Sequence, residues 1–294
     1  LGAARALIAA HIPFRVVAEN RPDLSGLRHL ICINAQHLAA EDAERIRAFV
    51  RDGGTVLATG LTSLQTPDGR SSGDFALADV LGVSFTGEFS PSMHYLAFSD
   101  GSFVSCHAPA PLVRAAGAAV QARINVPLFP PGDPDRYVSI HSDPPGRNTE
   151  FAGLSENAYG RGRALYLASP IFAEHERDAQ LRFATSLFAS RTPSGLLRAT
   201  DAPAAVEVSL MRATTAPAVL VSLVNWQADL PNIPARDIVL SLALPGNARP
   251  KACTRVSDGM PHPFTESDGG VRLTVPVVET IEMIRVDYEE RTQA

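Results

Sequence analysis

The sequence is poor in the residue types that mark several common protein classes. Of its 294 residues, 19% are charged and 6% are aromatic, with one tryptophan and three cysteines. Cys32, Cys106 and Cys253 are too few and too scattered for a disulfide framework or a Cys-x-x-Cys metal site. We therefore expect them to be reduced and mostly buried thiols.

Neither a basic surface nor a long apolar run is present. Lys and Arg number 26 against 31 Asp and Glu, which gives a formal net charge of −5. Nucleic-acid binding requires a cationic surface, and no basic run supplies one. A membrane-spanning helix requires about 20 consecutive apolar residues, and the sequence has no such run. We therefore expect neither nucleic acid nor membrane as a partner.

What is present is apolar material for about two domains. Hydrophobic residues reach 45% of the chain. Residues 1–10 (LGAARALIAA) predict a helix that leads into the strand-like residues 14–18 and 30–33. This order is typical of an α/β domain whose first strand has been removed, so we interpret the chain as a fragment of a longer protein. Any leader would lie upstream of Leu1, which leaves the location unknown, with the cytoplasm favoured.

The chain up to residue 192 alternates between helix and strand patterns. Further elements are predicted as a helix over 41–51, a buried strand over 55–59, a helix over 74–81, a hairpin around 159–162 and a helix over 178–189. Residues 82–146 are rich in Pro, Ser and Gly and predict an insertion or an elaborated edge. We predict an α/β domain with a doubly wound, mostly parallel sheet over residues 1–192.

The character of the chain changes after residue 192. Short strand patterns separated by turn residues are predicted over 206–212, 219–226, 238–244, 251–256, 271–275 and 281–286. No convincing helix pattern occurs among them. Several short strands at nearly regular spacing indicate a small all-β sandwich, which we place at residues 193–294.

Candidate nucleophiles follow the strand over 55–59. Thr62 and Ser63 occupy the place where a nucleophile elbow would lie, but no Gly-x-Ser-x-Gly pattern surrounds them. We expect them to cap the following turn. His141 lies two residues before Asp143, which could orient it as a base. A small hydrolase that uses Ser63 or Thr62 with His141 remains an alternative.

Paired carboxylates for glycoside hydrolysis are a further possibility. Asp143, Glu150 and Glu156 are close in sequence, and Asp74 and Asp79 share one predicted helix. Proximity in sequence does not establish the required geometry, and we expect these residues to form turns. Histidines do not occur in pairs at helical spacing, so no metal or cofactor site is predicted.

Trp226 is the single tryptophan, at the end of a predicted sandwich strand. Carbohydrate-binding modules stack sugars on exposed aromatic faces, but a lone tryptophan in a sandwich more often belongs to the core. Trp226 is nevertheless a candidate for sugar stacking. His94, Tyr95 and His107 lie in the loop-rich region, and we expect them at the surface or at an interface.

Several motifs in the same order resemble a known family. They are GGTVLATGLTSLQTPDGRSSGDFALADVLGV (53–83), HSDPPG (141–146), NAYGRGR (157–163) and VNW (224–226). Together they resemble the C-terminal region of bacterial hypothetical glycoside hydrolases. Those proteins carry a TIM barrel, a β-galactosidase trimerisation-type domain and a closing β-sandwich. Asp143 appears as an insertion relative to the HSPPG-type loop of that family.

The resemblance implies a class I glutamine amidotransferase-like fold without amidotransferase chemistry, because Gly60 stands where the nucleophilic cysteine would be. It places the catalytic carboxylates in a TIM barrel that this chain lacks, so no catalytic residue is assigned. The resulting hypothesis is a homo-oligomeric assembly region that covers the rim of a neighbouring cleft, with His94, Tyr95 and His141 as rim candidates. A carbohydrate-binding module centred on Trp226 is the alternative.

Overall fold

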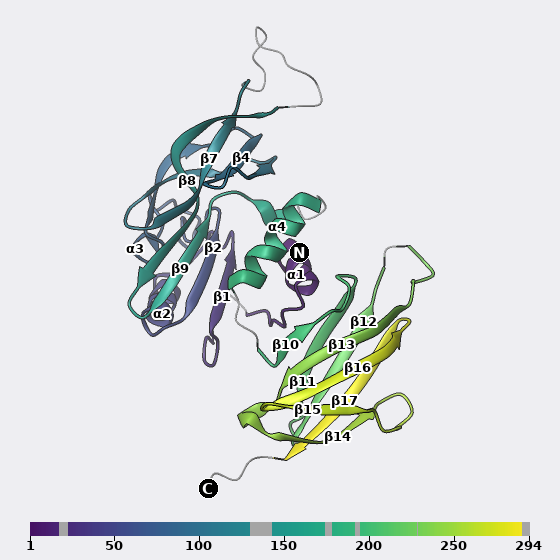
Figure 1. Ribbon diagram of the computed structural model, residues 1–294. Coiled ribbons are helices and arrows are strands. Elements are labelled where there is room, and N and C mark those ends of the chain that lie inside the picture. Colours follow the sequence, from purple (N-terminus) through teal and green to yellow (C-terminus); the bar gives the residue numbers. More distant parts are fainter. Residues whose placement is uncertain (18–22, 130–142, 174–177, 192–194, 228, 290–294) are drawn as a thin grey trace. The chain divides into compact units, whose positions relative to one another are not determined.

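The chain divides into two units (Figure 1). The structure is a computed structural model that describes residues 1–17, 23–129, 143–173, 178–191, 195–227 and 229–289. The first unit comprises Leu1–Ala3 and Val16–Phe183, and the second comprises Ala4–Arg15 and Ala184–Ala294.

The described elements are mostly strands. The helices are α1 (Gly2–Ala9), α2 (Ala40–Arg51), α3 (Ala78–Leu81) and α4 (Asp178–Arg191), with short 3-10 turns η1 (Ile171–Ala173) and η2 (Pro245–Asn247). The strands before α4 are β1 (His29–Ile33), β2 (Thr55–Thr59), β3 (Val83–Phe89), β4 (His94–Phe98), β5 (Phe103–Cys106), β6 (Pro111–Ala115), β7 (Ala119–Pro127), β8 (Pro145–Tyr159) and β9 (Gly162–Leu167). The strands after α4 are β10 (Leu197–Thr200), β11 (Val206–Arg212), β12 (Ala218–Asn225), β13 (Ala235–Ala243), β14 (Arg249–Arg255), β15 (Phe264–Ser267), β16 (Gly270–Val278) and β17 (Ile281–Glu289).

A mixed seven-stranded sheet forms the centre of the first unit, in the order β1-β2-β9-β8-β7-β4-β5. The pairs β1-β2 and β2-β9 are parallel, and all other neighbouring pairs are antiparallel. The expectation of a mostly parallel sheet is therefore wrong for the strands beyond β9. Short connections such as those of β4-β5 and β8-β9 produce antiparallel neighbours, whereas a parallel pair needs a long crossover.

The parallel part of this sheet follows the predicted pattern closely. Strand β2 matches the predicted range, and its residues Val56, Leu57 and Ala58 are buried between β1 and β9. Helix α2 is confirmed to within one residue, and it packs against β2 and β9. The apolar spacing of α2 explains this packing, because it places the buried side chains on one face.

Two local predictions in the first unit differ from the structure. The predicted helix over 74–81 is shortened to α3, because Asp74 accepts hydrogen bonds from the backbone N–H groups of Phe75 and Phe85, at 2.7 and 2.8 Å. This interaction holds the start of the segment in a turn. Residues 14–17 belong to no strand, and Ala18 lies outside the described residues.

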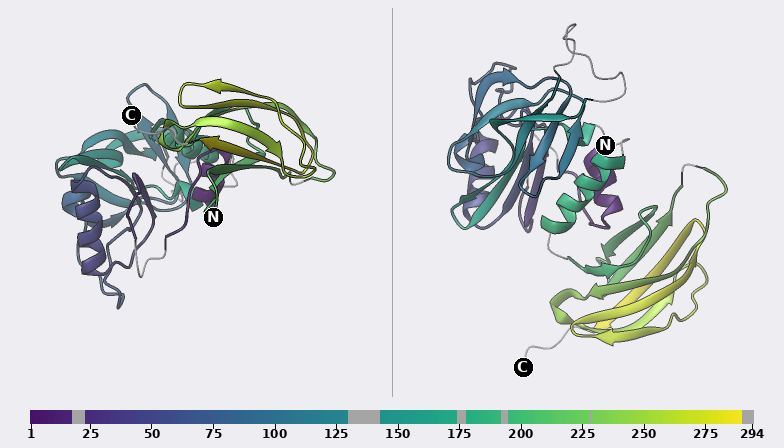
Figure 2. Two further views of the ribbon diagram at one scale, coloured as in Figure 1. Left: turned by 90° about the horizontal axis from the view of Figure 1, so that it is seen from below. Right: turned by 45° about the horizontal axis from the view of Figure 1, so that its top comes forward.

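The strands of the second unit form two four-stranded antiparallel sheets, β10-β13-β16-β15 and β11-β12-β17-β14. Figure 2 shows these sheets stacked on one another. Inward side chains from both sheets form one core, which includes Val221, Leu223, Leu240, Leu273 and Ile284. All six predicted strands are confirmed with boundary shifts. Strands β10 and β15 escaped prediction because each has only four residues.

The burial of the three cysteines agrees with the expectation drawn from the composition. Cys106 and Cys253 are buried and Cys32 is partly buried, with no disulfide among the three. Burial, assisted by Asp287, raises the pKa of the Cys253 thiol to about 12. None of the described helices is long and apolar enough to cross a bilayer.

Candidate functional site

The candidate site is the carboxyl edge of the parallel strands β1, β2 and β9. Ligands and nucleophiles gather at this edge in parallel sheets, because the connecting loops begin there. Asn34 directly follows β1, Gly60 directly follows β2, and Ser169 lies just after β9. The amide of Asn34 bridges the first two loops. Its side-chain Oδ1 accepts a hydrogen bond from Leu61 N at 2.8 Å, and the backbone N–H of Asn34 donates to Thr59 Oγ1 at 3.0 Å.

Gly60 adopts the left-handed backbone conformation of an elbow residue but has no side chain. Its φ is +56°, which a glycine accepts without steric cost. A Cβ atom at this position would lie 2.6 Å from Asn34 Oδ1. The amide of Asn34 therefore occupies the space that a nucleophilic side chain would need.

Thr62 and Ser63 are committed to the turn that follows Gly60. The Thr62 hydroxyl donates to Thr59 O at 2.7 Å and accepts from Ala35 N at 3.2 Å. Ser63 accepts from Leu77 N at 3.2 Å through its hydroxyl oxygen. Both residues are buried, with exposed fractions of 1% and 0%. The predicted turn-stabilising role agrees with these contacts, and neither hydroxyl faces a substrate.

A buried serine–histidine pair lies near the same edge, and the sequence did not reveal it. The imidazole Nε2 of His94 lies 2.8 Å from Ser169 Oγ, and its Nδ1 lies 3.2 Å from Ser90 Oγ. Burial lowers the pKa of His94 to about 4, with hydrogen bonds from the imidazole to the backbone at Pro91 and Ser92 opposing this shift and His107 adding to it. The imidazole is therefore neutral at pH 7.

The distance between His94 and Ser169 is that of a base and a hydroxyl nucleophile. Both residues, however, are too deeply buried for a substrate to reach them. His94 and Ser169 are both fully buried, at 0% exposure. A catalytic pair must reach its substrate, so we assign His94 and Ser169 a structural role that links β4 to the chain after β9. His94 lies in the interior and not on a surface rim, because its strand places the side chain inside the unit.

The other rim candidates have different surroundings. Tyr95 is partly buried on β4, and its hydroxyl donates to the backbone carbonyl of Asp143. Its ring packs edge-on against Phe103, with the ring centroids 6.2 Å apart. Burial and the nearby Asp143 raise the pKa of Tyr95. His141 lies outside the described residues, so the predicted pairing with Ser63 or Thr62 stays a prediction.

Two of the clustered carboxylates, Glu150 and Glu156, are engaged in hydrogen bonds and ion pairs. Glu150 accepts from Arg114 at 2.5 Å, and this hydrogen bond lowers the pKa of Glu150. Glu156 accepts from Gln121 at 2.7 Å and from Arg163 at 3.4 Å. Glycosidase carboxylates face one another across a cleft at about 5–10 Å. The contacts of Glu150 and Glu156 are instead those of residues that join strands and loops.

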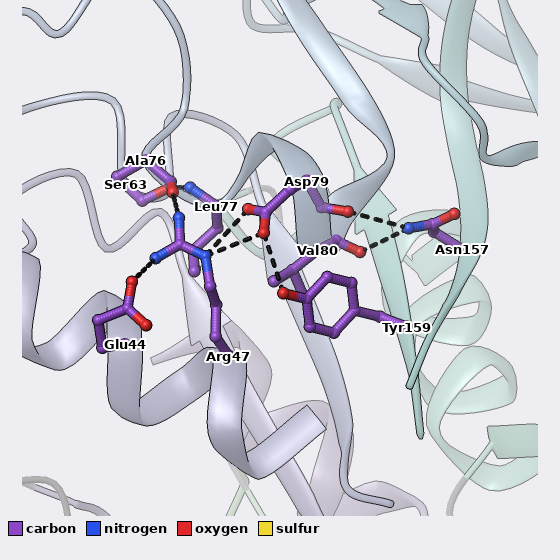
Figure 3. A network of polar contacts seen from close by, with 9 residues as sticks. All are labelled: Glu44, Arg47, Ser63, Ala76, Leu77, Asp79, Val80, Asn157 and Tyr159. Carbon is purple, nitrogen blue, oxygen red and sulfur yellow. Dashed lines mark hydrogen bonds and ion pairs between the residues drawn. The ribbon is translucent and has the colours of Figure 1, made fainter. Parts of the chain in front are cut away.

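Asp79, another of the predicted carboxylate candidates, belongs to a polar network that holds the β8-β9 hairpin against α2 and α3 (Figure 3). Arg47 Nε donates to Asp79 Oδ2 at 3.0 Å, and the Tyr159 hydroxyl donates to the same oxygen at 3.1 Å. Asn157 Nδ2 donates to Val80 O at 2.9 Å. Burial opposes ionisation of Asp79, but the hydrogen bonds from Arg47 and Tyr159 outweigh it and lower its pKa.

The glycines of the same hairpin allow it to approach α2 closely. Gly160 has a φ of +60°, and a Cβ there would lie 2.6 Å from the Cα of Arg51. A Cβ at Gly162 would lie 2.2 Å from the carbonyl oxygens of Val50 and Gly54. The motif around residues 157–163 therefore serves packing in this chain and not chemistry.

Trp226 lies in the second unit, directly after β12, and its side chain is 80% exposed. It is therefore not a core residue of the sandwich. Among the described residues, no group of three His, Cys, Asp or Glu side chains is placed to hold a metal ion.

Solved structures share this fold at low sequence identity. One is alpha-L-fucosidase isoenzyme 2 from Paenibacillus thiaminolyticus, with a TM-score of 0.79 and 22% identity. The match covers 98% of this chain and 45% of the fucosidase chain. The beta-galactosidase from Bacillus circulans sp. alkalophilus matches 97% of this chain and 36% of its own, with a TM-score of 0.66 and 18% identity. The beta-galactosidase from Rahnella sp. R3 matches the same shares, with a TM-score of 0.63 and 21% identity.

The fold of this chain is therefore one that occurs in glycoside hydrolases. The chain spans less than half the length of each of these proteins. No protein-family model matches the sequence, and neither does any curated protein sequence.

Proposed function

We propose that this chain is a non-catalytic assembly and accessory region of a glycoside-hydrolase-like protein. The observation that carries the proposal is Gly60, which has the backbone of an elbow residue with the Asn34 amide in place of a nucleophile. The buried hydroxyls of Thr62 and Ser63 support the same conclusion. The alternative of a serine–histidine hydrolase gains no support from them.

Residues 1–192 would then be a trimerisation-type domain of the amidotransferase-like class, and residues 193–294 its companion sandwich. Support comes from the three parallel strands β1, β2 and β9, with α2 packed against β2 and β9. Strand β1 is an edge of its sheet, where one more parallel strand can add.

The catalytic residues would lie in a TIM-barrel region of the same polypeptide. The matched fucosidase and beta-galactosidases are more than twice as long as the part that this chain matches. The chain described here would assemble the protein as a homo-oligomer and cover the rim of a neighbouring cleft.

An assembly surface needs an apolar centre within a polar ring. Residues 82–129 and 143–146 of the predicted rim region are described, and they expose Phe89, Phe103 and Leu128 at 49%, 45% and 55%. Phe103 lies on β5, an edge strand of the seven-stranded sheet. Its ring packs against the ring of Tyr95. We place the assembly surface at this edge.

The test is the oligomeric state of the 294-residue chain, measured by light scattering coupled to size exclusion at micromolar concentration. A stable dimer or trimer is expected. A monomer at all concentrations up to 100 μM would contradict the assembly role and leave the fold assignment unchanged.

A further inference from the structure

The loop between β12 and β13 exposes three large apolar side chains at one end of the sandwich. Trp226, Leu230 and Ile233 are 80%, 80% and 75% exposed. We call these three side chains the Trp226 platform. Several large exposed apolar side chains in one short loop are candidates for a binding site, whereas single scattered ones are not.

The backbone beneath the platform is fixed by a network of amide hydrogen bonds. Asn225 is buried, and its Nδ2 donates to Ile233 O at 2.9 Å and to Val278 O at 3.1 Å. Asn232 Nδ2 donates to Asn225 O at 2.7 Å. Gln227 Nε2 donates to Ile233 O at 2.8 Å.

These contacts join the two ends of the loop and bring Trp226 close to Ile233. Trp226 N also donates to Ala205 O at 3.1 Å, which ties the loop to the chain before β11. A binding loop that is already ordered loses little conformational entropy when a ligand arrives. The hydrogen bonds therefore fix the backbone that carries Trp226 and Ile233.

The charges near the platform favour a neutral ligand that carries hydroxyl groups. Residues 226–234 contain no lysine or arginine, so the loop offers no partner to an anionic ligand. The carboxylates of Asp229 and Glu279 have no hydrogen-bond or ion-pair partner within the described parts of the chain. Asp229 lies in the same loop, and the Glu279 carbonyl accepts from Asn225 at 3.1 Å. Carboxylates are strong acceptors for hydroxyl donors.

The small area of the platform favours a sugar over a protein as its ligand. A stable protein interface buries about 800 Å² on each partner. A large aromatic side chain supplies at most about 250 Å², and the platform adds only two aliphatic side chains to its single indole. The area is suited to one or two sugar rings, whose C–H faces pack on an indole.

We propose that the Trp226 platform is a carbohydrate-binding site for neutral oligosaccharides. One sugar ring stacks on the Trp226 indole, Leu230 and Ile233 extend the apolar contact, and Asp229 accepts from a ring hydroxyl. The inference rests on the proposed function in a glycoside-hydrolase-like protein. It gives the sandwich a role in holding substrate that is separate from assembly.

The single tryptophan makes this site directly measurable, because all tryptophan fluorescence of the chain comes from Trp226. The full chain is run in native gels that contain pectic galactan, arabinogalactan, galactomannan, xyloglucan or laminarin. Retarded migration in at least one gel is expected, together with a shift of the tryptophan emission when the matching oligosaccharide is added. Retardation in none of these gels overturns the proposal.

Variants then locate the binding. Trp226→Ala should weaken the retardation at least tenfold, and Trp226→Phe should keep part of it because a flat ring remains. Phe264→Ala is the matched control, since Phe264 is a partly exposed aromatic residue on β15 outside the loop, and it should bind like the parent chain. Circular dichroism confirms that each variant is folded.

Three outcomes separate this proposal from the assembly role. Equal retardation of the Trp226→Ala variant and the parent chain overturns the sugar site. A loss of oligomer mass in Trp226→Ala, measured by light scattering, also overturns it, because the platform would then be a protein interface. A monomeric parent chain that still binds a polysaccharide contradicts assembly alone.

Discussion

At the scale of single residues, His94 is a buried imidazole that must stay neutral for the fold to be stable. Its pKa of about 4 in the folded chain lies below the ordinary 6.5. The unfolded chain therefore binds a proton more readily as the pH falls below 6.5, and the folded state loses stability over the window from 6.5 to 4.

We predict that the free energy of unfolding falls by about 2 kcal/mol between pH 7 and pH 5 from this group alone. Urea unfolding of the first unit, followed by circular dichroism, measures the change. His94→Gln keeps an amide near Ser169 but does not titrate, so its stability should change much less over the same range. His29, whose pKa is also lowered by burial, contributes in the same direction in both proteins. An unchanged pH slope in His94→Gln would contradict this assignment.

Gly60 is the residue on which the non-catalytic interpretation depends. Gly60→Ala should lower the free energy of unfolding by about 2–4 kcal/mol, since it combines a left-handed φ with a contact of 2.6 Å to Asn34 Oδ1. Gly26→Ala is the control, because Gly26 has a φ of +71° and nothing within 4 Å of its Cβ position. That variant should lose only about 1–2 kcal/mol. Equal losses in the two variants would show that the Asn34 amide does not fill the elbow.

At the scale of elements, the contacts of Asn157 explain how the β8-β9 hairpin holds α3. The Nδ2 group binds the carbonyl oxygens of Val80 and Asp79 at 2.9 and 3.3 Å. Asn157→Ala leaves these carbonyl groups without that donor and should cost about 1–3 kcal/mol in urea unfolding. Tyr159→Phe should cost less, because Asp79 keeps its bonds to Arg47.

Arg161→Ala is the matched control for the same hairpin. The pair of Arg161 with Asp52 is exposed and 3.5 Å long, so its removal should change stability by less than about 0.5 kcal/mol. A loss in Arg161→Ala as large as that in Asn157→Ala would mean that the exposed pair, and not the amide, holds the hairpin.

Elements whose periodicity is strong were predicted well from the sequence. Helix α2 and strands β2 and β11 match their expected ranges to within one residue, because their apolar spacing and flanking turn residues are local signals. The segment before β1 was not predicted well. Residues 14–17 have a strand-like composition but belong to no strand, since a strand exists only through hydrogen bonds to a neighbour.

At the scale of the whole molecule, the assembly surface on β5 gives the remaining prediction. Phe103→Ser should shift the light-scattering mass toward the monomer by raising the dissociation constant about tenfold or more, because it removes an exposed aromatic residue from an edge strand. Trp226→Ala should leave the mass unchanged. An oligomer that resists Phe103→Ser and Leu128→Ser would place the interface elsewhere.

The candidate site was only partly predictable, because some of its contacts join residues that are far apart in the sequence. The lack of a Gly-x-Ser-x-Gly motif and the expected turn role of Thr62 and Ser63 were predicted from residues that are neighbours in sequence. Their hydrogen bonds with Ala35 N and Leu77 N join residues 27 and 14 positions apart and were not predicted. The contact of His94 with Ser169 joins residues 75 positions apart, and no local pattern signals it. The exposure of Trp226 likewise depends on the amide of Asn225 and its partners across the loop.

Local sequence was enough to predict α2, β2 and α4, the all-β second unit and the absence of a Gly-x-Ser-x-Gly motif after β2. Only the tertiary structure decided that most strand pairs of the first sheet are antiparallel, that His94 is interior and that Trp226 faces solvent. The physical reason is that backbone conformation and apolar periodicity are properties of short segments. Strand direction and burial depend on which distant segments become neighbours.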